Sequence, residues 1–193
     1  MHRPRSAHLE RDTTRVALAN GGKIVGGVKV PLNTPDFSSF LLRAKNSGAT
    51  TIALALAGAD LTNAIKQANE FRVADGGQNL AAMLSLISDV NAMGLSVAQG
   101  IVTSESFYWD LNDQTRQWSR RFMEKVPGQV PNMVHAGAYS AVSHYLRSVA
   151  SAGTIDASVV VARMKQMPVN DFNNQDVRVR QDGVCFTPCI SSA

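Results

Sequence analysis

Cysteine is scarce in this chain of 193 residues: only Cys185 and Cys189 occur, both in the last nine residues. A lone C-x-x-x-C spacing, with no second cysteine pair and no histidine beside it, does not complete a zinc site. The sequence therefore predicts two thiols in a loose tail, with no bound metal and no cofactor. Charged residues are also few, at 18%, but 45% of the residues are hydrophobic, which is typical of a globular protein and argues against disorder.

Long apolar runs are absent as well. No run approaches the roughly 20 residues that a membrane-spanning helix needs. The first twelve residues are basic and polar and contain no apolar segment of the kind found in a signal peptide. As written, the chain is therefore expected to stay in the cytoplasm and not to insert into a membrane.

The usual sequence signatures of catalysis are missing. The chain has no G-x-S-x-G, H-E-x-x-H or Walker A sequence, and the glycine pairs at 21–22 and 26–27 do not form G-x-G-x-x-G. The four histidines do not form a ligand pair at helical spacing. Asp89 and Glu105 could act as paired carboxylates, but nothing supplies a nucleophile or a metal. We therefore predict that the protein is not an enzyme.

Positive charge is not concentrated in any one stretch. The net charge is +4 and the pI about 9.3, yet the arginines are spread over the beginning, the middle and the end of the chain. No groove-reading motif accompanies them, so the sequence predicts solvated faces and no nucleic-acid partner.

The stretch from Lys23 to Phe71 alternates apolar and amphipathic runs. Residues 24–30 are short and rich in β-branched side chains, which predicts a strand. The next run has helical spacing after Asp36 and ends at Gly48. Residues 51–56 are apolar on both parities and predict a strand covered on both faces, and Asp60 is expected to cap the helix that follows. This β-α-β-α order predicts a parallel sheet with right-handed crossovers.

The rest of the chain predicts further strands and then a helical third. Before this stretch, residues 8–20 predict a helix. After it come a strand at 80–87, a short helical piece from about 88 through 95, which Gly94 is expected to terminate, and a strand at 98–103. Past Trp109 the pattern predicts helices over about 112–125, 134–150 and 156–165, with a short strand at 177–180. The predicted fold class is α/β.

Candidate binding residues follow the strands, where ligands bind in open α/β sheets. The loop from Ala57 to Asp60 has small side chains that would let a ligand approach a helix N-terminus. On spacing alone, however, a tight turn without a ligand is favoured, because most loops between a strand and a helix in such sheets hold nothing. Asp89, Glu105 and Phe107 follow the next two strands. Carboxylates and rings suit an amine-bearing or polar organic ligand. Asp89 could equally be a helix cap, and Phe107 with its aromatic neighbours could be packing.

The ordered series of motifs resembles the type I periplasmic solute-binding proteins of ABC transporters, specifically the leucine/branched-chain amino acid-binding group. The resemblance rests on LERDT at 9–13, PLNTPDFSSFLLRAKNSGA at 31–49, AGAD at 57–60, NAIKQA at 63–68, SDVNAMGLSVAQG at 88–100, ESFYWDLNDQT at 105–115 and HAGAYSAVSHYL at 135–146. It implies a periplasmic-binding-protein-like I fold. Residues 8–108 would form a Rossmann-like second-lobe unit, residues 109–183 would return to the first lobe, and residues 184–193 form a tail that does not match.

The resemblance also implies a function and a binding site. It implies a substrate-binding component for amino acids or related small polar solutes, working with a membrane permease in the periplasm; the alternative is a small-molecule sensor of the same fold. The ligand-binding positions carried over are Ala57, Gly58, Asp89, Glu105 and Phe107, and Asp60 ends the same loop. Against this pattern, a signal peptide and most of a first lobe are missing, so the sequence is expected to be a truncated fragment.

Overall fold

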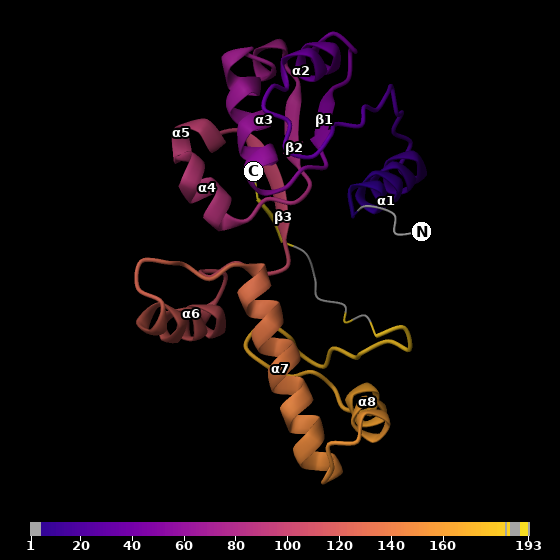
Figure 1. Ribbon diagram of the computed structural model, residues 1–193, viewed down its shortest axis with the longest axis vertical. Coiled ribbons are helices and arrows are strands. Elements are labelled where there is room, and N and C mark those ends of the chain that lie inside the picture. Colours follow the sequence, from indigo (N-terminus) through magenta and orange to yellow (C-terminus); the bar gives the residue numbers. More distant parts are fainter. Residues whose placement is uncertain (1–4, 184, 186–189, 193) are drawn as a thin grey trace. The chain divides into compact units, whose positions relative to one another are not determined.

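The computed structural model describes residues 5–183, 185 and 190–192 and divides into two compact units (Figure 1). Unit 1 comprises residues 1–104 and 191–193, and unit 2 comprises residues 105–190.

Unit 1 is built on a sheet with the strand order β1 (Thr51–Leu54), β2 (Asn79–Ala82), β3 (Ile101–Glu105) and β4 (Ile190–Ser192). The pairs β1–β2 and β2–β3 are parallel, with Leu54 opposite Ala82 and Ala82 opposite Thr103. Parallel neighbours need crossover connections, which α3 (Gly58–Glu70) and the pair α4 (Ile87–Met93) and α5 (Leu95–Ala98) provide. The predicted parallel α/β sheet is thus present.

The core of unit 1 lies on one face of this sheet, where α3, α4 and α5 pack (Figure 1). Ile52 and Leu54 of β1 are buried, whereas Thr51 and Ala53 are exposed. The prediction that this strand is covered on both faces was wrong. Helices cover only one face of this strand, so Thr51 and Ala53, whose side chains lie on the other face, are exposed to solvent. Other buried members of the core are Phe37, Leu41, Leu61, Ala64, Ile65, Ala68, Val73, Leu80, Ala82 and Met93.

Residues 24–30 are the clearest disagreement with the sequence prediction. They form no strand, and Ile24, Val25 and Val28 are 44–51% exposed. β-Branched composition favours an extended backbone, but a strand also requires a partner for its N–H and C=O groups. In the described part of unit 1 no strand pairs with this segment. The segment lies between α1 (Arg5–Ala19) and α2 (Ser38–Lys45) in the chain. Farther along, the short 3-10 turn Ala74–Gly76 follows α3.

Two other strands are shorter than predicted. The apolar run at 80–87 is a strand only to Ala82, and α4 already begins at Ile87. The strand predicted at 98–103 begins at Ile101, because Ala98 closes α5. Runs without alternation carry no marker of where a strand ends, so the boundaries shifted while the order of elements held.

Unit 2 contains α6 (Asp113–Lys125), α7 (Met133–Ala152) and α8 (Ala157–Gln166). Each has a side-chain N-cap, from Asn112, Asn132 and Asp156 respectively. The strand predicted at 177–180 is reduced to isolated antiparallel bridges, Val169 with Val177 and Val179 with Cys185. Cys185 is exposed, and partial burial raises its pKa above the usual 9.0. Cys189 lies outside the described residues.

An aromatic cluster holds unit 2 together. Phe107 is fully buried and meets Trp118 and Phe172 edge to face, with ring centroids 5.5 and 5.8 Å apart. Trp118 and Phe172 are stacked, with centroids 4.2 Å apart. Such pairs add about 0.5–1.5 kcal/mol each beyond the area they bury. The cluster therefore fixes the segment after β3 to α6 and to the loop after α8.

Candidate functional site

The carboxyl edge of the sheet in unit 1 gathers the loops that the sequence singled out. The N–H of Met83, just past β2, donates to the carbonyl of Leu54, the last residue of β1, at 3.0 Å. The loops 55–57 and 83–86 therefore leave the sheet from adjacent strands at the same end. This is the end at which open α/β sheets bind ligands.

Ala57 and Gly58 present backbone to solvent at this edge. Ala57 is extended, with φ −144° and ψ 156°, and no side chain caps the N-terminus of α3. Gly58 has φ +56°, which favours glycine, and a Cβ there would meet no atom within 4 Å. Helix N–H groups without intrahelical partners are suited to donate hydrogen bonds to oxygen acceptors, aided by the helix dipole. The loop is therefore open enough for an anionic or polar group to reach the N-terminus of α3.

Asp60 is not the helix cap that the sequence predicted. It lies within the first turn of α3, and its Oδ2 accepts the backbone N–H of Asn33 at 3.0 Å. The helix begins three residues earlier than predicted, with Ala57 at the N-cap position and Gly58, at φ +56°, as its first residue. Asp60 instead anchors the turn at residues 31–34, in which Asn33 itself has φ +60°.

Asp89 performs the capping role that the sequence left open. It is the third residue of α4, and its Oδ2 accepts the N–H of Leu86 at 2.9 Å. Next to this cap, Ser85 is 2% exposed. An Asp89 carboxylate that already accepts a backbone N–H has less capacity left for a ligand ammonium group than the sequence suggested.

Glu105 and Phe107 belong to unit 2, unlike the other candidates. Glu105 is the last residue of β3 and is half-buried. Phe107 has no exposed surface, because its ring lies inside the aromatic cluster. Its ring holds the backbone after β3 in place and offers no free face within this unit.

The structure thus places Ala57, Gly58 and Asp60 at the N-terminus of α3, which follows β1, and Asp89 in the first turn of α4, which follows β2. Sequence reasoning missed Asn33 and Ser85 at this edge. Ser85 could have been found as the one hydroxyl in the apolar run 80–87. Asn33 could not, because its link to Asp60 spans 27 residues.

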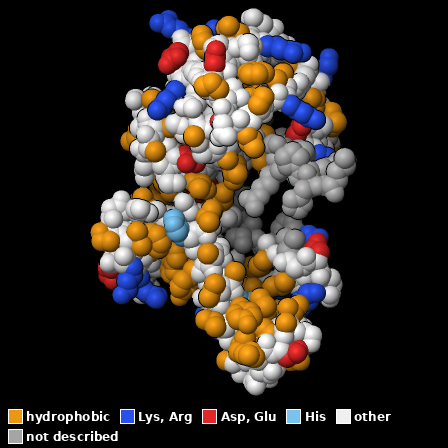
Figure 2. Space-filling model, viewed as in Figure 1, with side chains coloured by type: hydrophobic (Ala, Val, Ile, Leu, Met, Phe, Trp, Pro, Cys, Tyr) orange, Lys and Arg blue, Asp and Glu red, His pale blue; other side chains and the backbone are white. Residues whose placement is uncertain are grey.

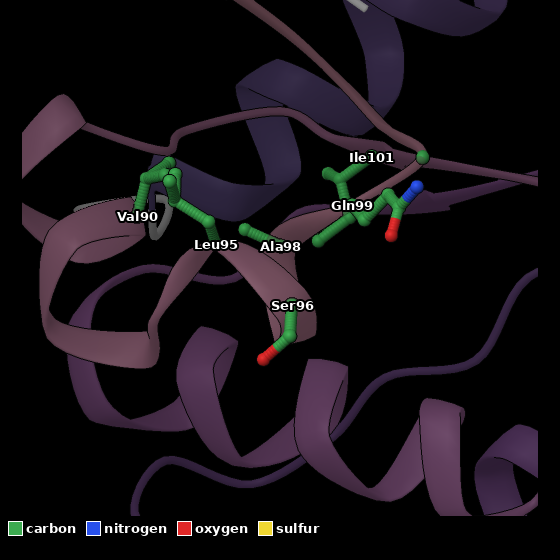
Figure 3. A pocket seen from close by; sticks show the side chains of 7 residues that line it. Val90, Leu95, Ser96, Ala98, Gln99 and Ile101 are labelled. Atoms are coloured by element: carbon green, nitrogen blue, oxygen red, sulfur yellow. The ribbon is translucent and has the colours of Figure 1, made fainter.

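A shallow hollow of about 420 Å³ lies elsewhere in unit 1, beside α4 and α5 (Figure 3). Its lining consists of Val90, Leu95, Ser96, Ala98, Gln99, Gly100 and Ile101. Ile101 is the first residue of β3, so the hollow adjoins the amino end of that strand and not the carboxyl edge. We therefore do not propose this hollow as the ligand-binding site.

The described residues contain neither a metal-binding cluster nor a membrane-spanning helix. Among them, no group of three or more His, Cys, Asp or Glu side chains is placed to hold a metal ion. Within the same part of the chain, no helix is both long enough and apolar enough to cross a membrane.

Comparison with known protein families shows to which family the chain belongs. The sequence model of the family described as periplasmic binding protein matches residues 4–190. The chain belongs to this family. Solved structures that are similar to this periplasmic binding protein include ligand-binding or solute-binding proteins of ABC transporters and a leucine binding protein.

Two solved structures are similar in both sequence and fold. A periplasmic binding protein from Burkholderia mallei is 41% identical, with a TM-score of 0.87 over 94% of this chain and 48% of its own. A branched chain amino acid ABC transporter periplasmic ligand-binding protein from Burkholderia xenovorans is 36% identical, with a TM-score of 0.84 over 97% of this chain and 50% of its own. The chain therefore spans about half the length of these relatives.

A third structure shares the fold at lower identity. It is an ABC transporter solute binding protein from R. palustris in complex with 4-hydroxybenzoate, 20% identical, with a TM-score of 0.82 over 94% of this chain and 51% of its own. No curated protein matches the chain.

Proposed function

We propose that this periplasmic binding protein is a substrate-binding component of an ABC transporter for amino acids or related small polar solutes. The observation that carries the proposal is the 36% identity, over 97% of the chain, to a branched chain amino acid ABC transporter periplasmic ligand-binding protein. The role requires no catalysis. Solute binding in the periplasm would present the loaded protein to a membrane permease.

The carboxyl edge of the sheet is the part of the site that unit 1 would contribute. We infer that Ala57 and Gly58 contact the solute through their backbone, with the N-terminus of α3 favouring a carboxylate or another acceptor group. Asp60 and Asp89 would act mainly by holding the loops at 31–34 and 83–86 in position. Glu105 and Phe107 would set the backbone path after β3.

This assignment favours solutes that bear a carboxylate over solutes recognised only through an ammonium group. The helix N-terminus attracts negative charge, whereas the carboxylates of Asp60 and Asp89 already accept backbone N–H groups. Both amino acids and aromatic acids carry the required carboxylate. The proposal therefore covers both, and leaves the choice between them to measurement.

A thermal-shift screen of the purified full chain tests the proposal. The panel contains leucine and valine, 4-hydroxybenzoate as an aromatic acid, leucinamide as the amide without a carboxylate, and sodium chloride at matched ionic strength. A ligand that binds only the native state at 100 times its Kd stabilises it by about 2.7 kcal/mol. We expect a shift with a carboxylate and a smaller one with leucinamide. A cooperative melt that no panel member moves would contradict solute binding by this chain.

A further inference from the structure

Ser85 is a buried serine at the carboxyl edge of the sheet in unit 1. It follows β2 in the loop 83–86, and only 2% of its surface is exposed. Its hydroxyl forms no hydrogen bond to another residue that the structure describes. Most buried polar groups in native proteins are hydrogen-bonded, and one that is not has lost its bonds to water without replacement. The Ser85 hydroxyl is therefore available to a group that enters this edge from outside the chain.

The other polar residues that are buried as whole residues in the described part of the chain all have partners. They are Thr115, Ser119, Asn132, His144, Ser148 and Asn174. The Ser148 hydroxyl, for example, donates to the carbonyl of His144 at 2.8 Å. A second hydroxyl without a partner belongs to the half-buried Thr103, but it is enclosed within the sheet opposite Ala82. Ser85 differs because it lies in a loop beyond the end of its strand.

The loops beside Ser85 are apolar. Residues 55–57 after β1 are Ala, Leu and Ala, and the other residues of the loop after β2 are Met83, Leu84 and Leu86. The strands end at the lower end of unit 1 in Figure 1. Figure 2, in the same view, shows hydrophobic side chains at this lower end and most charged side chains of unit 1 nearer its top. Apart from Ser85, these two loops offer a solute only apolar surface and backbone groups.

The carboxylates that follow the strands are already engaged within the chain. Asp60 after β1 and Asp89 after β2 each accept a backbone N–H, at 3.0 and 2.9 Å. Glu105, the last residue of β3, also interacts within the folded chain. Before α2, Asp36 accepts the N–H and the hydroxyl of Ser38. An ammonium group that entered this edge would therefore find no carboxylate held in reserve for it.

The two kinds of charged group thus meet different conditions at this edge. A carboxylate can accept N–H groups at the N-terminus of α3, where the helix dipole favours negative charge, and a hydroxyl proton as well. An ammonium group can donate one hydrogen to a serine hydroxyl, but that oxygen supplies no negative charge to compensate its desolvation. The apolar loops suit the uncharged body of a solute.

We propose that Ser85 determines specificity by donating its hydroxyl proton to the carboxylate of the solute, and that this chain selects carboxylic acids with an apolar aliphatic or aromatic body and no ammonium group. The inference rests on the proposed solute-binding function and narrows it, because that function alone also allows amino acids.

A matched series of ligands tests the selection on the full chain by isothermal titration calorimetry at pH 7. 4-Methylpentanoate is leucine without its ammonium group, 3-methylbutylamine is leucine without its carboxylate, and 3-phenylpropanoate with phenylalanine forms an aromatic pair. We expect at least one deaminated acid to bind at least tenfold more tightly than its amino acid, and the amine not to bind. Leucine or phenylalanine binding as tightly as its acid would overturn this inference and leave solute binding intact. Binding of no member of the series would overturn both.

Ser85→Ala tests the role of the hydroxyl. Affinity for the preferred acid should fall about tenfold or more, because a hydrogen bond to a charged group is lost. The melting temperature of the ligand-free chain should not fall, because the hydroxyl has no partner in the described chain to lose. Ser148→Ala, which removes a buried hydroxyl bonded within α7, should leave affinity unchanged. Unchanged affinity in Ser85→Ala, or an equal loss of affinity in both variants, would overturn the assignment.

Discussion

Replacing Gly58 with alanine separates the role of the α3 N-terminus in binding from its role in stability. Gly58 has φ +56°, and a Cβ built there meets no atom within 4 Å, so the substitution causes no clash. An L-residue in the left-handed region costs about 1–2 kcal/mol, partly offset by a less flexible unfolded chain. We expect a net loss of about 1 kcal/mol in the free energy of unfolding, which lowers the melting temperature by roughly 2–4 °C for a chain of this length.

The same methyl group would lie over the open backbone where we place the solute. We therefore expect the affinity for the carboxylate identified in the thermal-shift screen to fall by about tenfold or more, equivalent to about 1.4 kcal/mol. Urea denaturation measures the first effect and isothermal titration calorimetry the second.

Gly48 provides the matched control. It also has a positive φ, +73°, and a Cβ there likewise meets nothing within 4 Å, but it follows α2 at the amino end of β1. Gly48→Ala should lower stability by a similar amount, about 1 kcal/mol, and leave affinity unchanged. If Gly58→Ala leaves affinity intact, or if both variants lower it equally, the loop at Ala57 and Gly58 is not the solute contact.

Three further predictions concern stability. The Ser158 hydroxyl lowers the pKa of Asp156 below its usual 3.8. The Asp156 carboxylate therefore contributes stability above about pH 4, and this contribution is lost as the pH falls through the lower pKa of the folded state. In urea titrations, Asp156→Asn should be less stable than wild type at pH 7, and the difference should close toward about pH 2. Phe107→Ala should cost about 3–5 kcal/mol and red-shift Trp118 emission, because it empties a fully buried position; a loss below 1 kcal/mol would contradict the cluster. Asp89→Ala should lower stability by about 1 kcal/mol through loss of its bond to Leu86, whereas Asp89→Asn, which keeps an acceptor, should lose less.

Local sequence determined much of the fold, because helices form their hydrogen bonds within a few residues. The helix ending before Gly48 and those starting at Asn112 and Asp156 follow from caps and glycine, which act over one turn. The alternation of strand and helix from 51 to 105 likewise predicted a parallel sheet.

Only the tertiary structure decided which strands found partners and which faces were covered. Residues 24–30 have strand composition but no partner, and β1 is apolar on both parities but buried on one. A strand's hydrogen bonds come from segments distant in sequence, so its composition cannot supply them.

The same distinction holds at the candidate site. The sequence placed Ala57, Gly58, Asp60 and Asp89 at the carboxyl ends of strands, because strand order fixes where loops emerge. It could not determine that Asp60 would hold Asn33, or that Phe107 would be enclosed by Phe172, 65 residues later. These roles depend on which distant groups the folded chain brings within contact distance.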